Sequence, residues 1–275
     1  MFSRDCLFLI NRSTTTTVVN NDSKAIFVRG SRYCVQKKGW FENGKKQCRY
    51  IRKNKDWSER FWYENGQICS EVKWKNGLLE GLEQEWYENG QIHIKRNWKN
   101  GNQEGLEQAW YENGQKSVEC NWKNGNREGL EQEWHGNGRK KTERGWKNGK
   151  KEGVEQRWYA NKQKYYEANW KNGGLEGLER RWMYNGHKEY ECNWKNGLKN
   201  GLEQEWYEIE QLCMEINWKN GLKEGLEQQW YKNGQKKYEV NWKNGEKDGL
   251  ERWRYESEQK YYEVNWSNGV LTNIE

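Results

Sequence analysis

The sequence predicts an all-β fold, an elongated single-layer antiparallel sheet (a solenoid) of tandem 24-residue β-hairpin repeats. Three observations predict it. The tetrad Trp-Lys-Asn-Gly recurs at one constant interval from Trp74 to Trp242. A second tryptophan series, from Trp62 to Trp230, has the same period and is displaced from the first by half a repeat. Asn-Gly turn signals follow both series, so the chain reverses direction twice per repeat, which excludes helical solenoids.

The turn residues predict the kind of hairpin. Glu88, Asn89 and Gly90 suit a three-residue loop with Gly90 in the left-handed conformation. A second glycine recurs once per repeat at the phase of Gly81. At that phase we expect either close backbone packing or a β-bulge.

Alternation predicts which side chains are buried. Two residues before each Trp-Lys-Asn-Gly tryptophan the chain is mostly apolar, and glutamate usually precedes that position. In the other half-repeat, Leu82, Gln84 and Trp86 share one face and Glu83 shares the other with Glu85. We expect the face of Leu82 and Trp86 to join the buried side, with glutamate and lysine outside. The expected tryptophan ladder comprises Trp86, Trp98, Trp110, Trp122, Trp134, Trp146, Trp158 and Trp170.

This placement implies a ranking of substitutions. Trp146→Ala should open a cavity and cost about 3 to 5 kcal/mol. Substitution of Tyr111, on the opposite face, should cost much less.

Composition supports a repetitive rather than an ordinary globular chain. The 275 residues include 20 Trp, 16 Tyr and 29 Gly but no Pro, and the mean hydropathy is -1.44. Aromatic rings therefore carry much of the apolar burial. About nine to ten units cover residues 40–269, preceded by a basic, non-repetitive cap over 1–39 and followed by a C-terminal tail over 270–275.

Positive charge is concentrated at the front of the chain. Residues 1–60 hold 14 basic and 5 acidic residues, whereas the repeats are nearly neutral. This segment is either a solvated cap or a contact for an anionic surface such as membrane lipid. Nucleic acid is disfavoured because no binding motif accompanies the charge. The candidate contacts are Arg29, Arg32, Lys37, Lys38, Lys45, Lys46, Arg49, Arg52, Lys53 and Lys55.

The units resemble the MORN repeat, and more closely its bacterial variant. Residues 105–114, Gly-Leu-Glu-Gln-Ala-Trp-Tyr-Glu-Asn-Gly, followed by Trp-Lys-Asn-Gly from Trp122, carry the resemblance. The resemblance implies an extended β array without catalysis, used as a scaffold, a membrane-proximal tether or a protein-binding surface. Similar arrays are common in large DNA viruses of amoebae. The pattern departs from the family where Lys162, Glu210 and Glu258 replace the hairpin glycine and Arg254 replaces a tryptophan.

Catalytic, cofactor and metal sites are not expected. His93, His135 and His187 each lie at a different phase of the repeat, so no histidine pair recurs. The seven cysteines form no Cys-x-x-Cys pair, and no signal peptide core is present, which favours a cytoplasmic protein.

The tyrosine that follows the first tryptophan series leaves two interpretations open. It serves either sheet packing or a docking stripe for a protein or a sugar. The members of this stripe are Tyr87, Tyr111, Tyr159, Tyr207 and Tyr231.

The expected function is a non-enzymatic scaffold that mediates protein–protein interaction through its repeats. An anionic-lipid tether at the membrane periphery and a structural component of a virus particle stay open as alternatives. A glycan-binding repeat protein is a further alternative, although such repeats are shorter than these and need a secretion signal. Homo-oligomer formation is compatible with each of these functions.

Overall fold

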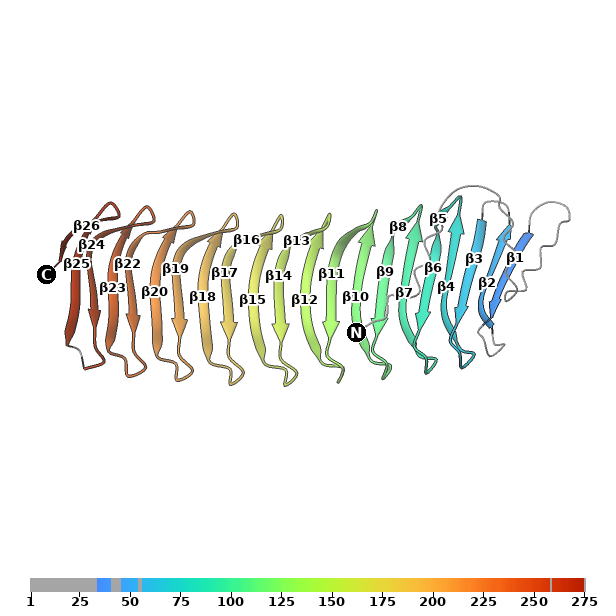
Figure 1. The fold of residues 1–275 in the computed structure, drawn as a ribbon, viewed down its shortest axis with the longest axis horizontal. Coiled ribbons are helices and arrows are strands. Elements are labelled where there is room, and N and C mark those ends of the chain that lie inside the picture. The colour runs from blue at the N-terminus through green and yellow to red at the C-terminus, as the bar shows by residue number, and fades with distance from the viewer. Residues whose placement is uncertain (1–33, 41–45, 54–55, 258, 275) are drawn as a thin grey trace.

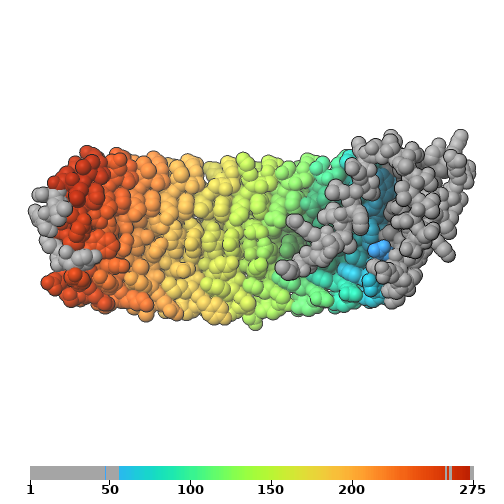
Figure 2. Space-filling model, viewed as in Figure 1, coloured from blue at the N-terminus to red at the C-terminus, as the bar shows by residue number. Residues whose placement is uncertain are grey.

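The computed structural model describes residues 34–40, 46–53, 56–257 and 259–274. These residues form one antiparallel sheet of 26 strands, and the described segments contain no helix. Each long strand pairs with the next long strand along the chain, and each two-residue strand pairs with the strand before it, so the sheet grows in one direction (Figure 1). The repeats follow one another along the long axis of an elongated body (Figure 2). The predicted all-β repeat sheet is confirmed.

The strands fall into four groups. Those that end in Trp-Lys-Asn-Gly turns, or in Trp-Ser-Asn-Gly for the last, are β4 (Ile68–Lys75), β7 (Ile92–Lys99), β10 (Lys116–Lys123), β12 (Lys140–Lys147), β15 (Lys164–Lys171), β18 (Lys188–Lys195), β20 (Leu212–Lys219), β23 (Lys236–Lys243) and β25 (Lys260–Ser267). Their hairpin partners are β6 (Gly81–Trp86), β9 (Gly105–Trp110), β11 (Asn126–Trp134), β14 (Gly153–Trp158), β17 (Gly177–Trp182), β19 (Leu198–Trp206), β22 (Gly225–Trp230) and β24 (Glu246–Arg254). Two-residue strands are β5 (Leu78–Leu79), β8 (Asn102–Gln103), β13 (Lys150–Lys151), β16 (Gly174–Leu175) and β21 (Leu222–Lys223). The ends are β1 (Cys34–Trp40), β2 (Lys46–Lys53), β3 (Asp56–Trp62) and, over residues that follow the last repeat, β26 (Val270–Ile274).

The turns have the predicted geometry. The Tyr87 N–H donates to the Gln91 carbonyl at 2.8 Å, which closes a loop of three residues, and Gly90 at its end has a φ of 84°. Lys162 adopts the same left-handed conformation without being glycine, with a φ of 80°. The Trp-Lys-Asn-Gly turns are two-residue turns in which both Asn76 and Gly77 have positive φ.

The glycine at the phase of Gly81 marks a bulge. Gly81 has a φ of 81°, and Glu80 interrupts the strand while its N–H donates to the Lys73 carbonyl at 2.9 Å. A Cβ added to Gly81 would meet nothing within 4 Å. The bulge alternative is confirmed and the close-packing alternative is wrong here, because glycine supplies a conformation rather than space.

Hydrogen bonds between successive repeats join both long edges of the sheet. At one edge the Tyr87 hydroxyl donates to the Trp110 carbonyl at 2.8 Å. At the other edge the Asn100 N–H donates to the Glu80 carboxylate at 2.8 Å. Both contacts recur along the array, so each hairpin is tied to the next at its two ends.

The apolar residues before the Trp-Lys-Asn-Gly turns are buried as predicted. The side of the paired strand that lies against them is not the predicted one. Cys120, Ala168 and Ile216 are at most 1% exposed, and the register pairs them with Glu107, Glu155 and Glu203. The glutamates of this row therefore point inward while the adjacent leucines face solvent. We call the two sides of the sheet the glutamate face and the leucine face.

A register shift explains the reversed assignment. Trp86 pairs with Ile92, but Glu85 pairs with Ile94, so one residue is inserted beside the hairpin loop. Because side chains alternate, a one-residue shift moves a strand's side chains to the opposite face of the sheet. The expectation that Leu82 would be buried and Glu83 exposed is therefore wrong.

The two tryptophan series lie on opposite faces. The Trp98 indole donates to Glu83 at 2.6 Å, on the glutamate face. Lys116 lies 5.4 Å from the Trp134 ring and pairs with Glu119, which alternates with the buried Cys120 and so belongs to the leucine face. All eight tryptophans of the expected ladder are half-buried, so the single inward ladder is wrong. The cost of Trp146→Ala stays a prediction, and it includes the hydrogen bond that Trp146 donates to Glu131.

Candidate functional site

The glutamate face carries a row of carboxylates on the inner side of the sheet. Glu131 is 1% exposed and Glu155 is 0% exposed, although no second layer covers them in the described structure. An unpaired carboxylate at such a position would be very costly. The row comprises Glu83, Glu107, Glu131, Glu155, Glu179, Glu203, Glu227 and Glu251.

A basic residue four positions earlier neutralises several of these carboxylates. Lys151 Nζ lies 2.7 Å from Glu155, and the same spacing gives contacts of 2.5 to 2.7 Å at three later repeats. Each of these lysines also lies over the ring of a tryptophan from the next hairpin, as Lys151 does at 4.2 Å from the Trp170 centroid. Arg127 takes this position beside Glu131 at 2.9 Å.

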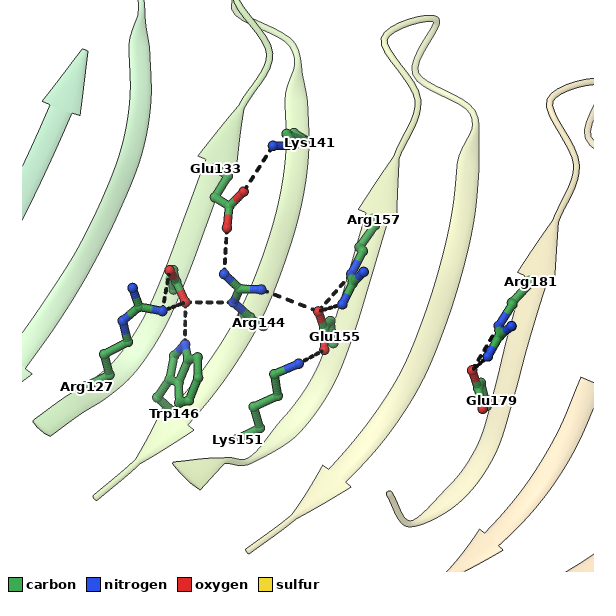
Figure 3. A network of polar contacts seen from close by, with 11 residues as sticks. Arg127, Glu133, Lys141, Arg144, Trp146, Lys151, Glu155, Arg157, Glu179 and Arg181 are labelled. Atoms are coloured by element: carbon green, nitrogen blue, oxygen red, sulfur yellow. Dashed lines mark hydrogen bonds and ion pairs between the residues drawn. The ribbon is translucent and has the colours of Figure 1, made fainter. Parts of the chain in front are cut away.

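Cations also reach the same glutamates from other positions (Figure 3). Arg144, on the paired strand, contacts Glu131 at 2.7 Å. Arg157 contacts Glu155 at 2.8 Å from two positions later along the same strand. Glu107 instead accepts a hydrogen bond from the neutral Gln103 amide at 2.7 Å, so the group that meets the carboxylate varies from repeat to repeat.

These pairings lower carboxyl pKa values. Burial alone would raise the pKa of Glu131, but the hydrogen bond from Arg144 and the charges of Arg144 and Arg127 hold it below the ordinary value. Burial of Glu155 is likewise outweighed by hydrogen bonds from Lys151 and Arg157, which lower its pKa. Both carboxylates are therefore charged near neutral pH and act as structural anions.

The leucine face carries a regular line of exposed aliphatic side chains, which we call the leucine row. Leu82, Leu106 and Leu226 are 40% exposed, Leu130 is 50% and Val154 is 49% exposed. Leu178, Leu202 and Leu250 lie at the same phase and are half-buried. With two strands per repeat, successive members lie about 10 Å apart.

Polar residues beside the leucine row neutralise one another. The Lys116 ammonium contacts Glu119 at 2.5 Å, and Gln108 donates to the same carboxylate at 2.7 Å. The same lysine position pairs with glutamate in four further repeats. The leucine row therefore lies beside a belt with little net charge, which suits a protein surface better than a polyanion.

The tyrosine stripe has a structural role in the sheet. Tyr111 is half-buried, and its hydroxyl donates to the Trp134 carbonyl of the next repeat at 2.7 Å. Equivalent bonds of 2.8 to 3.3 Å join Tyr87, Tyr159, Tyr207 and Tyr231 to the repeats that follow them. At the same phase His135 replaces tyrosine, and its Nε2 lies 2.9 Å from the Trp158 carbonyl. Docking on this stripe stays a proposal.

The basic segment lies partly outside the described residues, which include neither Arg29, Arg32, Lys45 nor Lys55. Lys37 and Lys38 lie in β1, and Lys46, Arg49, Arg52 and Lys53 lie in β2. The register places Lys38 opposite Arg49, and Arg49 opposite Arg60 of β3. Three cationic positions therefore follow one another across this end of the sheet.

A groove of about 590 Å³ lies in the middle of the array. Gly153, Trp170, Gly177 and Trp194 line it together with several asparagines and charged residues. Within the described part of the chain, no group of three or more His, Cys, Asp or Glu residues is arranged to hold a metal ion. The same residues include no helix long and apolar enough to cross a membrane.

Sequence reasoning missed two features, the leucine row and the buried carboxylates. A signal for both was present, because each repeat from Leu82 to Leu250 has Leu or Val immediately before glutamate at this phase. A glutamate that recurs at one phase of the repeat could lie on either face of the sheet. The register shift that places it inside is not visible in the sequence.

This geometry defines a class of protein, the open β-hairpin repeat array whose units bury their inner face only by stacking. The family model of the MORN repeat variant matches residues 58–76, 79–100, 103–124, 151–172 and 223–244. The chain is therefore a MORN-variant repeat protein, as the resemblance implied. Repeats of this type are non-enzymatic and generally serve contacts with proteins or membranes. No curated protein matches the chain.

Proposed function

We propose that this protein is a non-enzymatic scaffold whose leucine row binds a protein partner. The observation that carries the proposal is the exposure of Leu82, Leu106, Leu130, Val154 and Leu226, which are 40 to 50% exposed at one phase of the repeat. Single exposed leucines are ordinary on protein surfaces, whereas a continuous apolar line with a polar margin is typical of an interaction surface. The identity of that partner determines whether the protein acts in the cytoplasm, at a membrane or in a virus particle.

The spacing of the row indicates the shape of the partner. Apolar groups about 10 Å apart match residues seven apart on an α-helix, which are separated by about 10.5 Å. A helix laid across the strands would place successive apolar residues near successive members of the leucine row. Each contact is weak, but several repeats contribute to one interface.

A matched pair of triple variants tests the proposal. Leu106→Asn, Leu130→Asn and Leu226→Asn together replace three of the five exposed members of the row. The control carries Leu78→Asn, Leu198→Asn and Leu222→Asn, whose leucines are 48 to 50% exposed beside the turns. Cross-linking in extracts of the source organism identifies partners, and titration calorimetry with the purified partner measures affinity. We expect the row variant to lose binding at least tenfold and the control to retain it, whereas equal losses would contradict the proposal.

The basic end of the sheet supports a second candidate, contact with an anionic lipid surface. Lys38, Arg49 and Arg60 follow one another in register, and Arg60 also contacts Glu71 at 2.8 Å. Like charges on adjacent strands are unfavourable unless an anion approaches them. Flotation with phosphoinositide vesicles tests this candidate. Binding should fall for the Lys38→Gln, Arg49→Gln double variant, and binding that survives deletion of residues 1–60 would refute it.

A further inference from the structure

Two neighbouring repeats of the glutamate face share one arrangement of arginine, glutamate and tyrosine. In the first, Arg157 Nη2 lies 2.8 Å from Glu155 Oε1, and the guanidinium lies 4.7 Å from the Tyr166 ring centroid. In the second, Arg181 Nη2 lies 2.8 Å from Glu179 Oε1, and the guanidinium lies 4.6 Å from the Tyr190 ring centroid. Each arginine thus takes the same carboxylate oxygen and covers the same kind of ring.

The other carboxylate oxygen differs between the two repeats (Figure 3). Lys151 contacts Glu155 Oε2 at 2.7 Å, whereas Glu179 Oε2 is buried and has no hydrogen-bond partner. The Glu179 side chain is only 3% exposed, so this oxygen is withdrawn from water. An unsatisfied charged oxygen at such a position is expensive and calls for a donor.

The difference follows from one residue in the sequence. Leu175 stands where neighbouring repeats have Lys151, Lys199, Lys223 and Lys247. Each of those lysines contacts a buried glutamate and lies 4.2 to 4.9 Å from the ring of the tryptophan that precedes the next two-residue turn. The equivalent ring here is Trp194, where the cation found is Lys199 at the longer distance of 6.0 Å. Glu179 and Trp194 therefore keep the carboxylate and the ring, while position 175 supplies no ammonium. The Trp194 indole N–H is likewise buried without an acceptor, whereas its equivalents donate to the row glutamate in five other repeats.

The position is reachable from outside. The four lysine side chains that fill it in other repeats are 22 to 30% exposed, so the ammonium site lies just beneath the surface. Trp194 also lines the groove of about 590 Å³. Glu179 and Leu175 lie outside the lining of that groove, so an entering side chain would reach Glu179 Oε2 from the Trp194 side.

We propose that Glu179, Trp194 and Leu175 form a binding site for the ammonium group of a partner protein's lysine side chain. The ammonium donates to Glu179 Oε2 and lies over the Trp194 ring, as Lys151 does in the preceding repeat, and the aliphatic stem packs on Leu175. The proposal rests on the proposed scaffold function. It adds that one lysine of the partner protein is anchored at this site. It is independent of the leucine row because it lies on the opposite face.

Nuclear magnetic resonance of the indole N–H groups tests the site in the full-length chain. The probe is Nα-acetyl-lysine amide, and Nα-acetyl-norleucine amide is the control without charge. The Trp194 signal is assigned from a Trp194→Phe variant. We expect the lysine probe to shift this signal saturably, with a dissociation constant on the order of millimolar, as suits a single ion pair at low salt. The norleucine probe should shift it at least tenfold less.

Two variants at position 175 sharpen the test. Leu175→Lys places the cation within the chain and should weaken binding of the lysine probe at least tenfold. Leu175→Met should leave the affinity for the probe unchanged. Absence of a saturable shift, equal shifts by both probes, or unchanged binding to Leu175→Lys would overturn the site. Spermidine binding ten times more tightly than the lysine probe would assign the site to a free polyamine and refute the lysine proposal. None of these outcomes affects the leucine-row variants, so the two proposals fail separately.

Discussion

Replacement of Glu155 by glutamine removes the charge at the centre of the glutamate face without changing the shape of the side chain. Lys151 and Arg157 then lose the anion that they contact at 2.7 and 2.8 Å, and Arg144 loses one at 3.6 Å. Removal of one partner from a buried ion pair costs about 3 to 5 kcal/mol. Because Lys151 and Arg157 are 22% and 35% exposed and can turn toward water, we expect about 2 to 3 kcal/mol here.

Hydrogen exchange measured by mass spectrometry is the appropriate assay, because a repeat array loses stability locally. Amides of β14 and β15 should exchange about 30- to 150-fold faster in the variant, which is the same free energy expressed as a rate ratio. Amides of β22 and β23, three repeats away, should change by less than about twofold.

Glu167→Gln is the matched control. Glu167 lies on the leucine face, pairs with Lys164 at 2.5 Å and is 26% exposed, so its loss should cost less than about 1 kcal/mol. Equal acceleration of exchange in the two variants would show that burial of the glutamate row does not determine its contribution. The assignment of the two faces would then be wrong.

Three further predictions concern acid stability, one turn and one inter-repeat bond. Burial of Glu239 is outweighed by hydrogen bonds from Lys236 and Arg254, which lower its pKa to about 2. Its stabilising contribution is complete above the ordinary pKa of 4.5 and is lost as the pH falls toward 2, so melting temperatures should drop in that window; a flat profile would contradict this. Lys162→Gly should relieve the strain of a φ of 80° and raise stability by about 1 kcal/mol in urea unfolding, whereas a loss would show that the lysine side chain stabilises the turn. Tyr111→Phe should cost about 1 kcal/mol by removing the bond to the Trp134 carbonyl, while Tyr184→Phe, at a residue 65% exposed, should be neutral in the same assay.

The repeat, the turns and half of the inner face could be predicted because they depend on local residues. Asn76 and Gly77 dictate a tight turn, and Gly90 dictates the left-handed end of a three-residue loop. The alternation that places Cys120 inside is likewise contained within one strand. The ion pairs of the buried glutamates could not be predicted, because their partners lie on different strands or change position from repeat to repeat.

The sequence by itself determined that this chain is a stack of β-hairpins, since the constant repeat period and its turn residues permit little else. Only the tertiary structure decided which side of each hairpin faces inward. A one-residue register shift beside the Glu88–Gly90 loop exchanges the two sides of one strand, which turns Glu83 inward and Leu82 outward. Alternation has a period of two, so sequence pattern defines the two faces but the pairing between strands selects the buried one.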